Sequence, residues 1–451
     1  MSKTITKPTK FPTVAPLLAS LALKSDSLSY SLIGAAQAIA LVLNGLALPQ
    51  ALNRIFTDSN VSPAQRGAIQ DLSYRSMRQS GRVDALIAAM TSKAPEPALL
   101  YSLLCCALAL IVEEDESQHP YPAFTVVDQA VNAAAAHPDM AHAKNMVNAL
   151  LRRFLRERAV LLAAAMKLPA ARWNYPSWWI DACKAAYPQQ WQAILAAGNL
   201  TPPLTLRINQ RKTSMPAYLA LLQEQGIQAS AIGSFAVRLA QPVPVQQIPG
   251  FMEGLVSVQD AAAQLAAPLL GLEDGMRVLD ACAAPGGKTG HLLESASITL
   301  TALDSDPKRM VKITENLQRL QLNAQLLVGD ASKADWWDGE LFDRIVADVP
   351  CTASGIIRRH PDIRWLRRKV DSAQLATLSG RILDNLWSML KPGGKLLLVT
   401  CSIWPQESEA QAAAFAHRHG ARRLAAPGQL LPMASAEQDH DGLFYALFEK
   451  T

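Results

Sequence analysis

Residues 277–289, Arg-Val-Leu-Asp-Ala-Cys-Ala-Ala-Pro-Gly-Gly-Lys-Thr, decide how the C-terminal part of this chain folds. The first four predict a buried strand that ends in an acid, and Gly286 and Gly287 open the helix that follows. Glycine lets the backbone approach a ligand closely at such a turn. The spacing matches neither G-x-G-x-x-G nor the P-loop pattern, so a pyrophosphate site is disfavoured.

Outward from this stretch the sequence alternates strands and helices. Further strands are predicted at residues 300–304, 324–328, 344–347 and 395–400. Asp306 and Pro307 form the N-cap and first position of one helix, and a long amphipathic helix is predicted over 371–390. Such alternation predicts a parallel sheet with crossover helices. We therefore expect an α/β Rossmann-like domain over residues 251–451.

Three acids stand at or just after the ends of the predicted strands: Asp304, Asp330 and Asp348. Ligands of open α/β sheets bind at the carboxyl ends of the strands, so these side chains should meet at one crevice. Asp304 can hold ribose hydroxyls and Asp330 can meet an adenine amino group. Carboxylates without a phosphate cradle suit S-adenosylmethionine. A helix-capping role would explain one such acid, but it is disfavoured for three in register.

Cys351 and Cys401 directly follow two neighbouring strands, so both thiols should face this crevice. Methylation of cytosine at C5 needs a thiol, because C5 becomes nucleophilic only after a thiolate adds to C6. Asp348 can hydrogen-bond the cytosine edge and favour the charge that addition creates. The alternative role is that of a small buried hydrophobe, which we expect for Cys105, Cys106 and Cys183.

Composition limits the class of protein. The chain has 451 residues, half of them apolar, and a net charge of +5, which excludes a disordered chain and permits a polyanionic partner. Its six cysteines include no C-x-x-C pair, so we expect neither a structural metal site nor a disulfide scaffold. The apolar runs 32–48 and 98–112 are too short to span a membrane, which favours a cytoplasmic protein without a membrane partner.

The N-terminal half is predicted to be mostly helical. Residues 1–27 read as a mobile arm, 28–160 as a helical bundle and 165–250 as a small α+β domain with a strand at 204–208. Four tryptophans within the third segment are expected in a core rather than on a base-stacking surface: Trp173, Trp178, Trp179 and Trp191.

Two basic clusters are candidates for RNA contact. One lies in the loop after Cys351 and comprises Arg358, Arg359, Arg364, Arg367 and Arg368. The other, on the last helix of the bundle, includes Arg152 and Arg153. Charge runs are usually solvated faces, but the position of the loop beside the expected site favours phosphate contacts there. For the helix, RNA and solvent remain equally good alternatives.

Several motifs together resemble a known family. They are Asp280-Ala-Cys-Ala-Ala-Pro-Gly-Gly-Lys-Thr289, Asp348-Val-Pro-Cys351, Ile357-Arg-Arg-His-Pro-Asp362 and Thr400-Cys-Ser402. These motifs are similar to those of the NOL1/NOP2/Sun family of RNA cytosine-C5 methyltransferases, and most of all to its bacterial Sun/Fmu branch. In that branch the methyltransferase domain is fused to a NusB-like RNA-binding bundle, whose end the helix around 147–153 resembles.

The resemblance implies specific roles. Cys401 would be the nucleophile, and Cys351 would assist release of the methylated product. Cofactor contacts would come from Cys282, Ala283, Ala284, Pro285, Gly286, Gly287, Lys288, Asp304, Asp330 and Asp348. The implied substrate is 16S ribosomal RNA, methylated by a monomer. Two alternatives stay open: the same chemistry on tRNA or another rRNA site, and a non-catalytic NusB-like RNA-binding or assembly factor.

Overall fold

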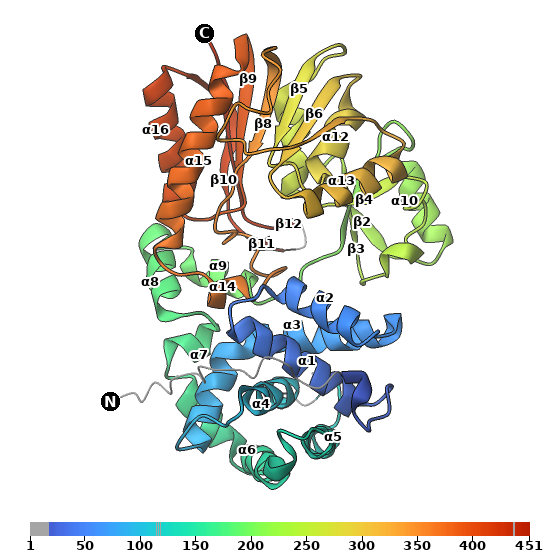
Figure 1. The fold of residues 1–451 in the computed structure, drawn as a ribbon, viewed down its shortest axis with the longest axis vertical. Helices are drawn as coiled ribbons and strands as arrows, with labels where there is room; N and C mark the ends of the chain where they lie inside the picture. Colours follow the sequence, from blue (N-terminus) through green and yellow to red (C-terminus); the bar gives the residue numbers. More distant parts are fainter. Residues whose placement is uncertain (1–17, 114, 116, 118, 436–437) are drawn as a thin grey trace. The chain divides into compact units, whose positions relative to one another are not determined.

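The computed structural model describes residues 18–113, 115, 117, 119–435 and 438–451. These residues form two compact units (Figure 1). One unit holds the chain up to residue 199 together with 360–367, and the other holds 200–359 and 368–451. Within the described ranges, no helix is both long and apolar enough to cross a membrane.

A seven-stranded sheet forms the centre of the second unit, with strand order β10-β13-β9-β8-β5-β6-β7 (Figure 1). The bounds are Arg277–Ala281 (β5), Thr299–Asp304 (β6), Gln325–Val328 (β7), Phe342–Asp348 (β8), Leu390–Thr400 (β9), Arg422–Leu430 (β10) and Leu443–Glu449 (β13). Strands β5 to β9 are parallel to their neighbours, as predicted. β13 and β10 add an antiparallel edge that the sequence reading did not foresee.

Helices cover both faces of this sheet, so its central strands are apolar on both sides, whereas the edge strands β7 and β10 are partly exposed. On β9, Leu397 packs in the cluster that contains the side chains of α11, α12 and α13, whereas Leu396 and Leu398 pack in the cluster with α15 and α16. The helix bounds are Ala266–Leu270 (α11), Gly287–Ser295 (α12), Pro307–Leu320 (α13), Asp371–Ser388 (α15) and Glu409–His419 (α16). This two-sided burial is typical of a Rossmann-like domain.

A second, four-stranded antiparallel sheet lies in the same unit, with order β2-β3-β1-β4. Its elements are Thr205–Ile208 (β1), Met215–Glu224 (α10), Ala229–Ile232 (β2), Ala236–Leu239 (β3) and Val256–Val258 (β4). The side chain of Tyr218 on α10 is buried against this sheet, and its hydroxyl donates to the carbonyl of Pro249 at 2.8 Å. The predicted strand at 204–208 is thus present.

The first unit is a helical bundle. Its helices are Leu28–Leu43 (α1), Leu48–Asp58 (α2), Pro63–Met90 (α3), Ala98–Ile111 (α4), Ala123–Ala136 (α5), Lys144–Ala165 (α6), Pro169–Trp173 (α7), Ser177–Ala186 (α8) and Trp191–Ala197 (α9). α1 and α4 are buried almost throughout, which explains their unbroken apolar sequences. Of the expected core tryptophans, Trp179 is fully buried, and Trp173 packs edge-on against Trp191.

The expected N-terminal arm is only partly described. Residues 1–17 lie outside the described part of the chain. At residue 18 the chain is already anchored: Leu18 is fully buried in the bundle, and its backbone N–H donates to the Ser59 hydroxyl at 3.1 Å. Leu21 and Leu23 also pack against the core of the bundle. The sequence carries no clear signal of this anchoring, because these apolar residues follow a Pro- and Lys-rich stretch.

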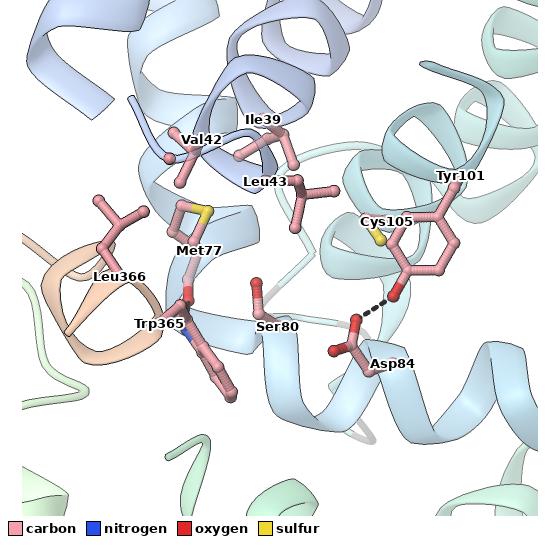
Figure 2. Close-up of a pocket in the computed structure, with 11 residues that line it drawn as sticks. Ile39, Val42, Leu43, Met77, Ser80, Asp84, Tyr101, Cys105, Trp365 and Leu366 are labelled. Atoms are coloured by element: carbon pink, nitrogen blue, oxygen red, sulfur yellow. Dashed lines mark hydrogen bonds between the residues drawn. The ribbon is translucent and has the colours of Figure 1, made fainter. Parts of the chain in front are cut away.

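Residues 360–367 pack within the helical unit although they come from the C-terminal half. The Trp365 indole donates to the Met77 carbonyl at 3.2 Å, and Asp362 accepts from the Leu48 N–H at 2.9 Å. Trp365 and Leu366, from α14 (Ile363–Leu366), line a cavity of about 230 Å³ together with side chains of α1, α3 and α4 (Figure 2). The helical unit is therefore completed by a segment distant in sequence.

Candidate active site

The loop between β5 and α12 is built for close approach of the backbone to a ligand. Gly286 caps α12 with φ +94°, and a Cβ there would lie 3.2 Å from the Ile313 side chain. A larger residue at this position would therefore be strained. The loop is held in place by the Ala284 N–H, which donates to Asp304 at 3.0 Å. Cys282 also has a positive φ of 60°.

Two of the predicted acids face one cavity of about 110 Å³. The cavity is lined by Cys282, Leu303, Asp304, Ser305, Arg309, Gly329, Asp330, Ala331, Pro350, Leu378 and Ile382. Asp304 is almost fully buried, and its second oxygen accepts from the Asp306 N–H at 3.0 Å. Asp330 is half-exposed, and bonds from the N–H and hydroxyl of Ser332 lower the pKa of its carboxyl. The cavity thus offers one fixed and one accessible carboxylate at adjacent strand ends.

A fourth acid, Asp280 at the end of β5, was not among the predicted contacts. It is fully buried, and its Oδ2 accepts from the Thr289 hydroxyl at 2.7 Å. Its Oδ1 has no hydrogen-bond partner among the described residues. Burial raises the pKa of Asp280 to about 7. A buried acceptor without a donor indicates that a cationic or hydrogen-bonding group of a ligand completes this site.

Lys288 and Asp348 form an ion pair beside this loop, with Nζ 2.7 Å from Oδ2. Burial alone would lower the pKa of Lys288, but Asp348 outweighs it and the pKa is raised. The ammonium therefore stays charged and holds Asp348, at the end of β8, in a fixed direction. The sequence had predicted Lys288 as a cofactor contact; the structure adds that it orients the carboxylate expected to meet the base.

The two predicted cysteines lie together, with their sulfur atoms 3.4 Å apart. Cys351 lies three residues after the end of β8, and Cys401 directly follows β9. The hydrogen bond with Cys351, together with burial, raises the pKa of the Cys401 thiol, whereas the charge of Lys288 opposes this rise. Two half-buried thiols at one sheet edge, beside a carboxylate and an ammonium, can perform nucleophilic chemistry on a planar ring.

The other cysteines do not share this geometry. Cys105, Cys106 and Cys183 are buried, and burial raises the pKa of Cys106 and of Cys183 to about 12. Cys282 lines the cofactor cavity, and burial raises the pKa of its thiol as well. Their burial confirms the expected role of Cys105, Cys106 and Cys183 as small buried hydrophobes. A raised thiol pKa does not by itself distinguish them from Cys401, whose pKa is also raised.

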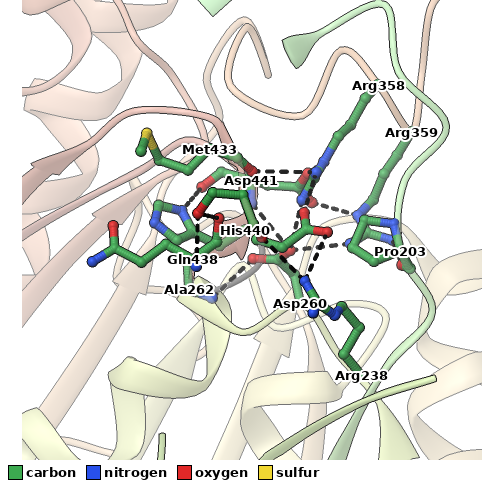
Figure 3. Close-up of polar contacts among 12 residues, drawn as sticks. Pro203, Arg238, Asp260, Ala262, Arg358, Arg359, Met433, Gln438, His440 and Asp441 are labelled. Carbon is green, nitrogen blue, oxygen red and sulfur yellow. Dashed lines mark hydrogen bonds and ion pairs between the residues drawn. The ribbon is translucent and has the colours of Figure 1, made fainter. Parts of the chain in front are cut away.

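The structure contradicts the predicted RNA contact at Arg358 (Figure 3). Arg358 is 1% exposed and donates to Asp439 and Asp441, each at 2.6 Å. Arg359 is paired with Asp441 and with Asp260. Arg358 balances acids that are buried with it, so its guanidinium group is directed into the protein rather than toward a phosphate backbone. Arg359 pairs with two of the same acids but keeps 26% of its side chain exposed, so its RNA contact stays a prediction.

This ion-pair network braces the loop beside Cys401. Gly355 donates its N–H to the Cys401 carbonyl at 2.8 Å, and its own carbonyl accepts from the Gly442 N–H at 2.8 Å. A Cβ on Gly355 would lie 2.1 Å from the Gly442 carbonyl oxygen, so only glycine fits. Arg358 and Arg359 follow this contact directly, and their partner Asp441 precedes Gly442. The segment that contains Arg358 and Arg359 is therefore braced next to the loop that carries Cys401.

The remaining basic residues divide between core and surface. Arg364 is fully buried, with bonds to the carbonyls of Asn174 at 3.0 Å and Gly198 at 2.7 Å, so its predicted phosphate contact is also corrected. Arg367 is half-buried, and Arg368 is exposed beside Asp371. On α6, Arg152 is exposed and bonds Asn148, whereas Arg153 pairs with Glu157 and the Met90 carbonyl.

The sequence reading missed two buried polar residues that support the site. Arg207, on β1, makes a bidentate pair with Glu294 and donates to the Gly287 carbonyl at 2.8 Å, at the start of α12. Glu407 joins the two cysteine loops through Thr352 and Ser402. Neither residue lies at the end of a parallel strand, the signal by which the other site residues were found.

Taken together, the Rossmann-like sheet without a phosphate cradle and the acid-lined crevice beside two thiols define a methyltransferase of the kind that uses a nucleoside methyl donor. A sequence profile described as "16S rRNA methyltransferase RsmB/F" matches residues 267–449. Two further profiles match, one for the NusB family at 33–156 and one for an RsmF/B-like ferredoxin-like domain at 175–246.

Whole-chain comparisons agree with this class. The chain is 43% identical over 432 residues to ribosomal RNA small subunit methyltransferase B of Pseudomonas putida, covering 92% of this chain and 97% of the relative. It is 41% identical to the protein of the same name from Vibrio cholerae, covering 86% and 91%. The chain therefore belongs to the RsmB family of 16S rRNA methyltransferases, which have an N-terminal NusB domain.

Solved structures share the fold. The crystal structure of PH0851 has a TM-score of 0.73 at 23% identity and covers 95% of this chain and 100% of that one. A methyltransferase homologue from Pyrococcus horikoshii has a TM-score of 0.54 at 25% identity, covering 62% of this chain and 97% of its own. These similarities agree with the observed arrangement of a helical part, a small antiparallel sheet and the larger mixed sheet.

Proposed function

We propose that this protein transfers a methyl group from S-adenosylmethionine to C5 of a cytosine in 16S ribosomal RNA. The observation that carries the proposal is the pair of thiols at 3.4 Å beside the Lys288–Asp348 ion pair, at the edge of the sheet where the cofactor cavity opens. Membership of the RsmB family supports the choice of 16S rRNA as the substrate.

The residues present fit the methyl donor. The cavity has carboxylates at two strand ends, Asp304 and Asp330, which suit ribose hydroxyls and an adenine amino group. Asp280 offers a buried oxygen without a donor, which suits an ammonium group. When bound, the cofactor supplies an electrophilic methyl on a sulfonium. We propose contacts from the loop Cys282, Ala283, Ala284, Pro285, Gly286, Gly287 and Lys288 as well.

The chemistry assigned to the chain's own residues proceeds in four steps. The Cys401 thiolate adds to cytosine C6, which breaks the C5–C6 double bond and places an electron pair at C5. Asp348, oriented by Lys288, hydrogen-bonds the base and stabilises the addition product. C5 takes the methyl group and then loses its proton to a base. The electron pair of that C–H bond restores the double bond as the bond to Cys401 breaks.

Cys351 is proposed to assist this last step. Its sulfur lies within hydrogen-bonding distance of the Cys401 sulfur, so it can deliver or accept a proton as the C–S bond breaks. The target base must leave its stack to reach these thiols, which costs least in an unpaired or strained RNA segment. Exposed Arg152 and Arg368 remain the proposed phosphate contacts, with Arg367 and Arg153 beside them.

The domain division is proposed as 28–160 for the NusB-like domain, 165–250 for the linker domain and 251–451 for the methyltransferase domain. The profile matches at 33–156, 175–246 and 267–449 support it.

The test is restoration of the methyl mark in cells that lack the gene. Bisulfite sequencing should show one 16S rRNA cytosine methylated with the wild-type chain and not with Cys401→Ala. Cys351→Ala should instead accumulate enzyme covalently bound to RNA. If the methyl mark is lost only from tRNA, the substrate is tRNA rather than 16S rRNA. If the purified protein does not bind S-adenosylmethionine in titration calorimetry, a non-catalytic RNA-binding factor is favoured.

A further inference from the structure

Behind the two cysteines lies a buried carboxylate, Glu407, in the short 3-10 helix η6 (Pro405–Glu407). Glu407 is only 2% exposed. Oε1 accepts from the Thr352 N–H at 2.9 Å, and Oε2 accepts from the Thr352 hydroxyl at 2.6 Å and from the Ser402 hydroxyl at 2.5 Å. One carboxylate therefore joins two loops that are 50 residues apart in sequence.

The placement of these partners is informative. Thr352 directly follows Cys351, and Ser402 directly follows Cys401. Each thiol is thus one peptide unit away from a residue that Glu407 holds. Because the three hydrogen bonds are made to a buried charged acceptor, they are stronger than bonds between neutral groups and resist displacement by water.

A second layer of bonds makes the arrangement rigid. The Ser402 hydroxyl oxygen accepts from the Trp404 N–H at 3.0 Å and lies 3.0 Å from the Ser354 hydroxyl. The Ser354 hydroxyl in turn accepts from the Ile403 N–H at 2.9 Å. The two loops are therefore tied to each other just after the thiols, and Glu407 is the group shared by both.

We propose that Glu407 is a positioning residue that sets the spacing of the two thiols. This inference rests on the proposed function, in which Cys401 adds to the ring and Cys351 assists its release. The two thiols must reach the same base in turn, and a displacement of about 1 Å can cost roughly a hundredfold in rate. Glu407 acts through Thr352 and Ser402, the residues that directly follow the two thiols.

The test uses the full chain with Glu407→Gln, and Glu409→Gln as the matched control. Glu409 lies two residues away, is exposed and pairs with Arg423 on the surface. In single-turnover assays with radiolabelled S-adenosylmethionine and 16S rRNA, Glu407→Gln should slow methyl transfer about 10- to 100-fold while leaving cofactor affinity unchanged. The control should behave as the wild type does.

A readout of thiol spacing separates positioning from general stability. Diamide takes up the two electrons and two protons released when the thiols of Cys351 and Cys401 form a disulfide. In the wild type this disulfide should form readily, because the sulfurs already lie 3.4 Å apart. Glu407→Gln should slow its formation several-fold relative to Glu409→Gln, as measured by mass spectrometry of the linked peptides.

The outcomes are distinguishable. If Glu407→Gln fails to fold, Thr352→Val provides a second test, because it removes one hydroxyl donor and keeps the N–H. It should slow both methyl transfer and disulfide formation, by a smaller factor. Wild-type methyl transfer and disulfide formation in the folded variants would overturn the positioning role while leaving the proposed function intact. Full methyl transfer by Cys401→Ala would instead overturn the proposed function itself.

Discussion

Removal of Arg207 should destabilise the methyltransferase unit strongly. Arg207 and Glu294 are 1% and 4% exposed, and the guanidinium makes two bonds to the carboxylate at 2.7 and 3.0 Å. Arg207→Met leaves the Glu294 carboxylate buried without its cation. Removing one partner of such a pair costs about 3–5 kcal/mol in the free energy of unfolding. The melting temperature of a unit of this size should fall by roughly 6–20 °C.

The same pair provides its own control. The double variant Arg207→Met with Glu294→Leu removes both charges and should recover at least half of the lost stability, because no unpaired charge stays buried. Arg423→Met breaks a pair whose side chains are 36% and 54% exposed, so it should cost at most about 1 kcal/mol. Urea unfolding, followed by circular dichroism, measures all three variants.

Two results would refute this reasoning about Arg207. The first is a single variant that unfolds within about 1 kcal/mol of the wild type, since this would mean that water or another cation replaces the guanidinium. The second is a double variant no more stable than the single one, since this would place the loss in the bonds from Arg207 to Gln259 and Gly287 rather than in the unpaired charge.

Two further predictions concern titration in the active site. Because the pKa of Asp280 is raised to about 7, its carboxyl is largely protonated below that pH and must lose a proton to bind an ammonium. Affinity for S-adenosylmethionine, measured by calorimetry, should therefore rise about fivefold between pH 6 and 7, and this rise should vanish in Asp280→Asn. The hydrogen bond between Cys351 and Cys401 is the main cause that raises the pKa of Cys401. Cys351→Ala should therefore speed alkylation of Cys401 by iodoacetamide at pH 8, whereas an unchanged rate would show that burial alone sets that pKa.

The sequence predicted the core of the fold because its signals are local. Five parallel strands were predicted from short apolar runs, several of them ending in or next to an acid, and the structure has all five close to the expected positions. Asp304, Asp330 and Asp348 could be grouped in advance because parallel strands end at one edge of a sheet. The same rule brought Cys351 and Cys401 together, and their sulfur atoms do lie in contact.

The parts that were missed depend on partners distant in the chain. A run of arginines beside the site looks like an RNA contact until Asp439 and Asp441, some 80 residues away, are found paired with Arg358. Arg364 likewise has its acceptors about 165 to 190 residues earlier, in the helical unit. The sequence around an arginine does not show which distant acids will be buried with it. A solvent-exposed arginine and a buried one therefore cannot be distinguished from their neighbours in the sequence.

The antiparallel edge of the sheet was also not predicted. β13 pairs with β9 from Phe444↔Thr400 to Glu449↔Lys395, and it is buried on both faces. Its sequence, Leu-Phe-Tyr-Ala-Leu-Phe-Glu, is too short and uniformly apolar to distinguish a strand from a helix by periodicity. Its pairing with β9 shows that the segment is a strand.

The central claim is that Cys401 bonds transiently to C6 of the target cytosine, and trapping that bond tests it most directly. Substrate RNA with 5-fluorocytidine at the target position accepts the thiolate and the methyl group but has no C5 proton to lose, so the enzyme cannot leave. The account predicts a stable protein–RNA adduct whose digestion places the modified nucleotide on the peptide containing Cys401, and no adduct with Cys401→Ala. An adduct on Cys351, or one that persists in Cys401→Ala, would contradict it.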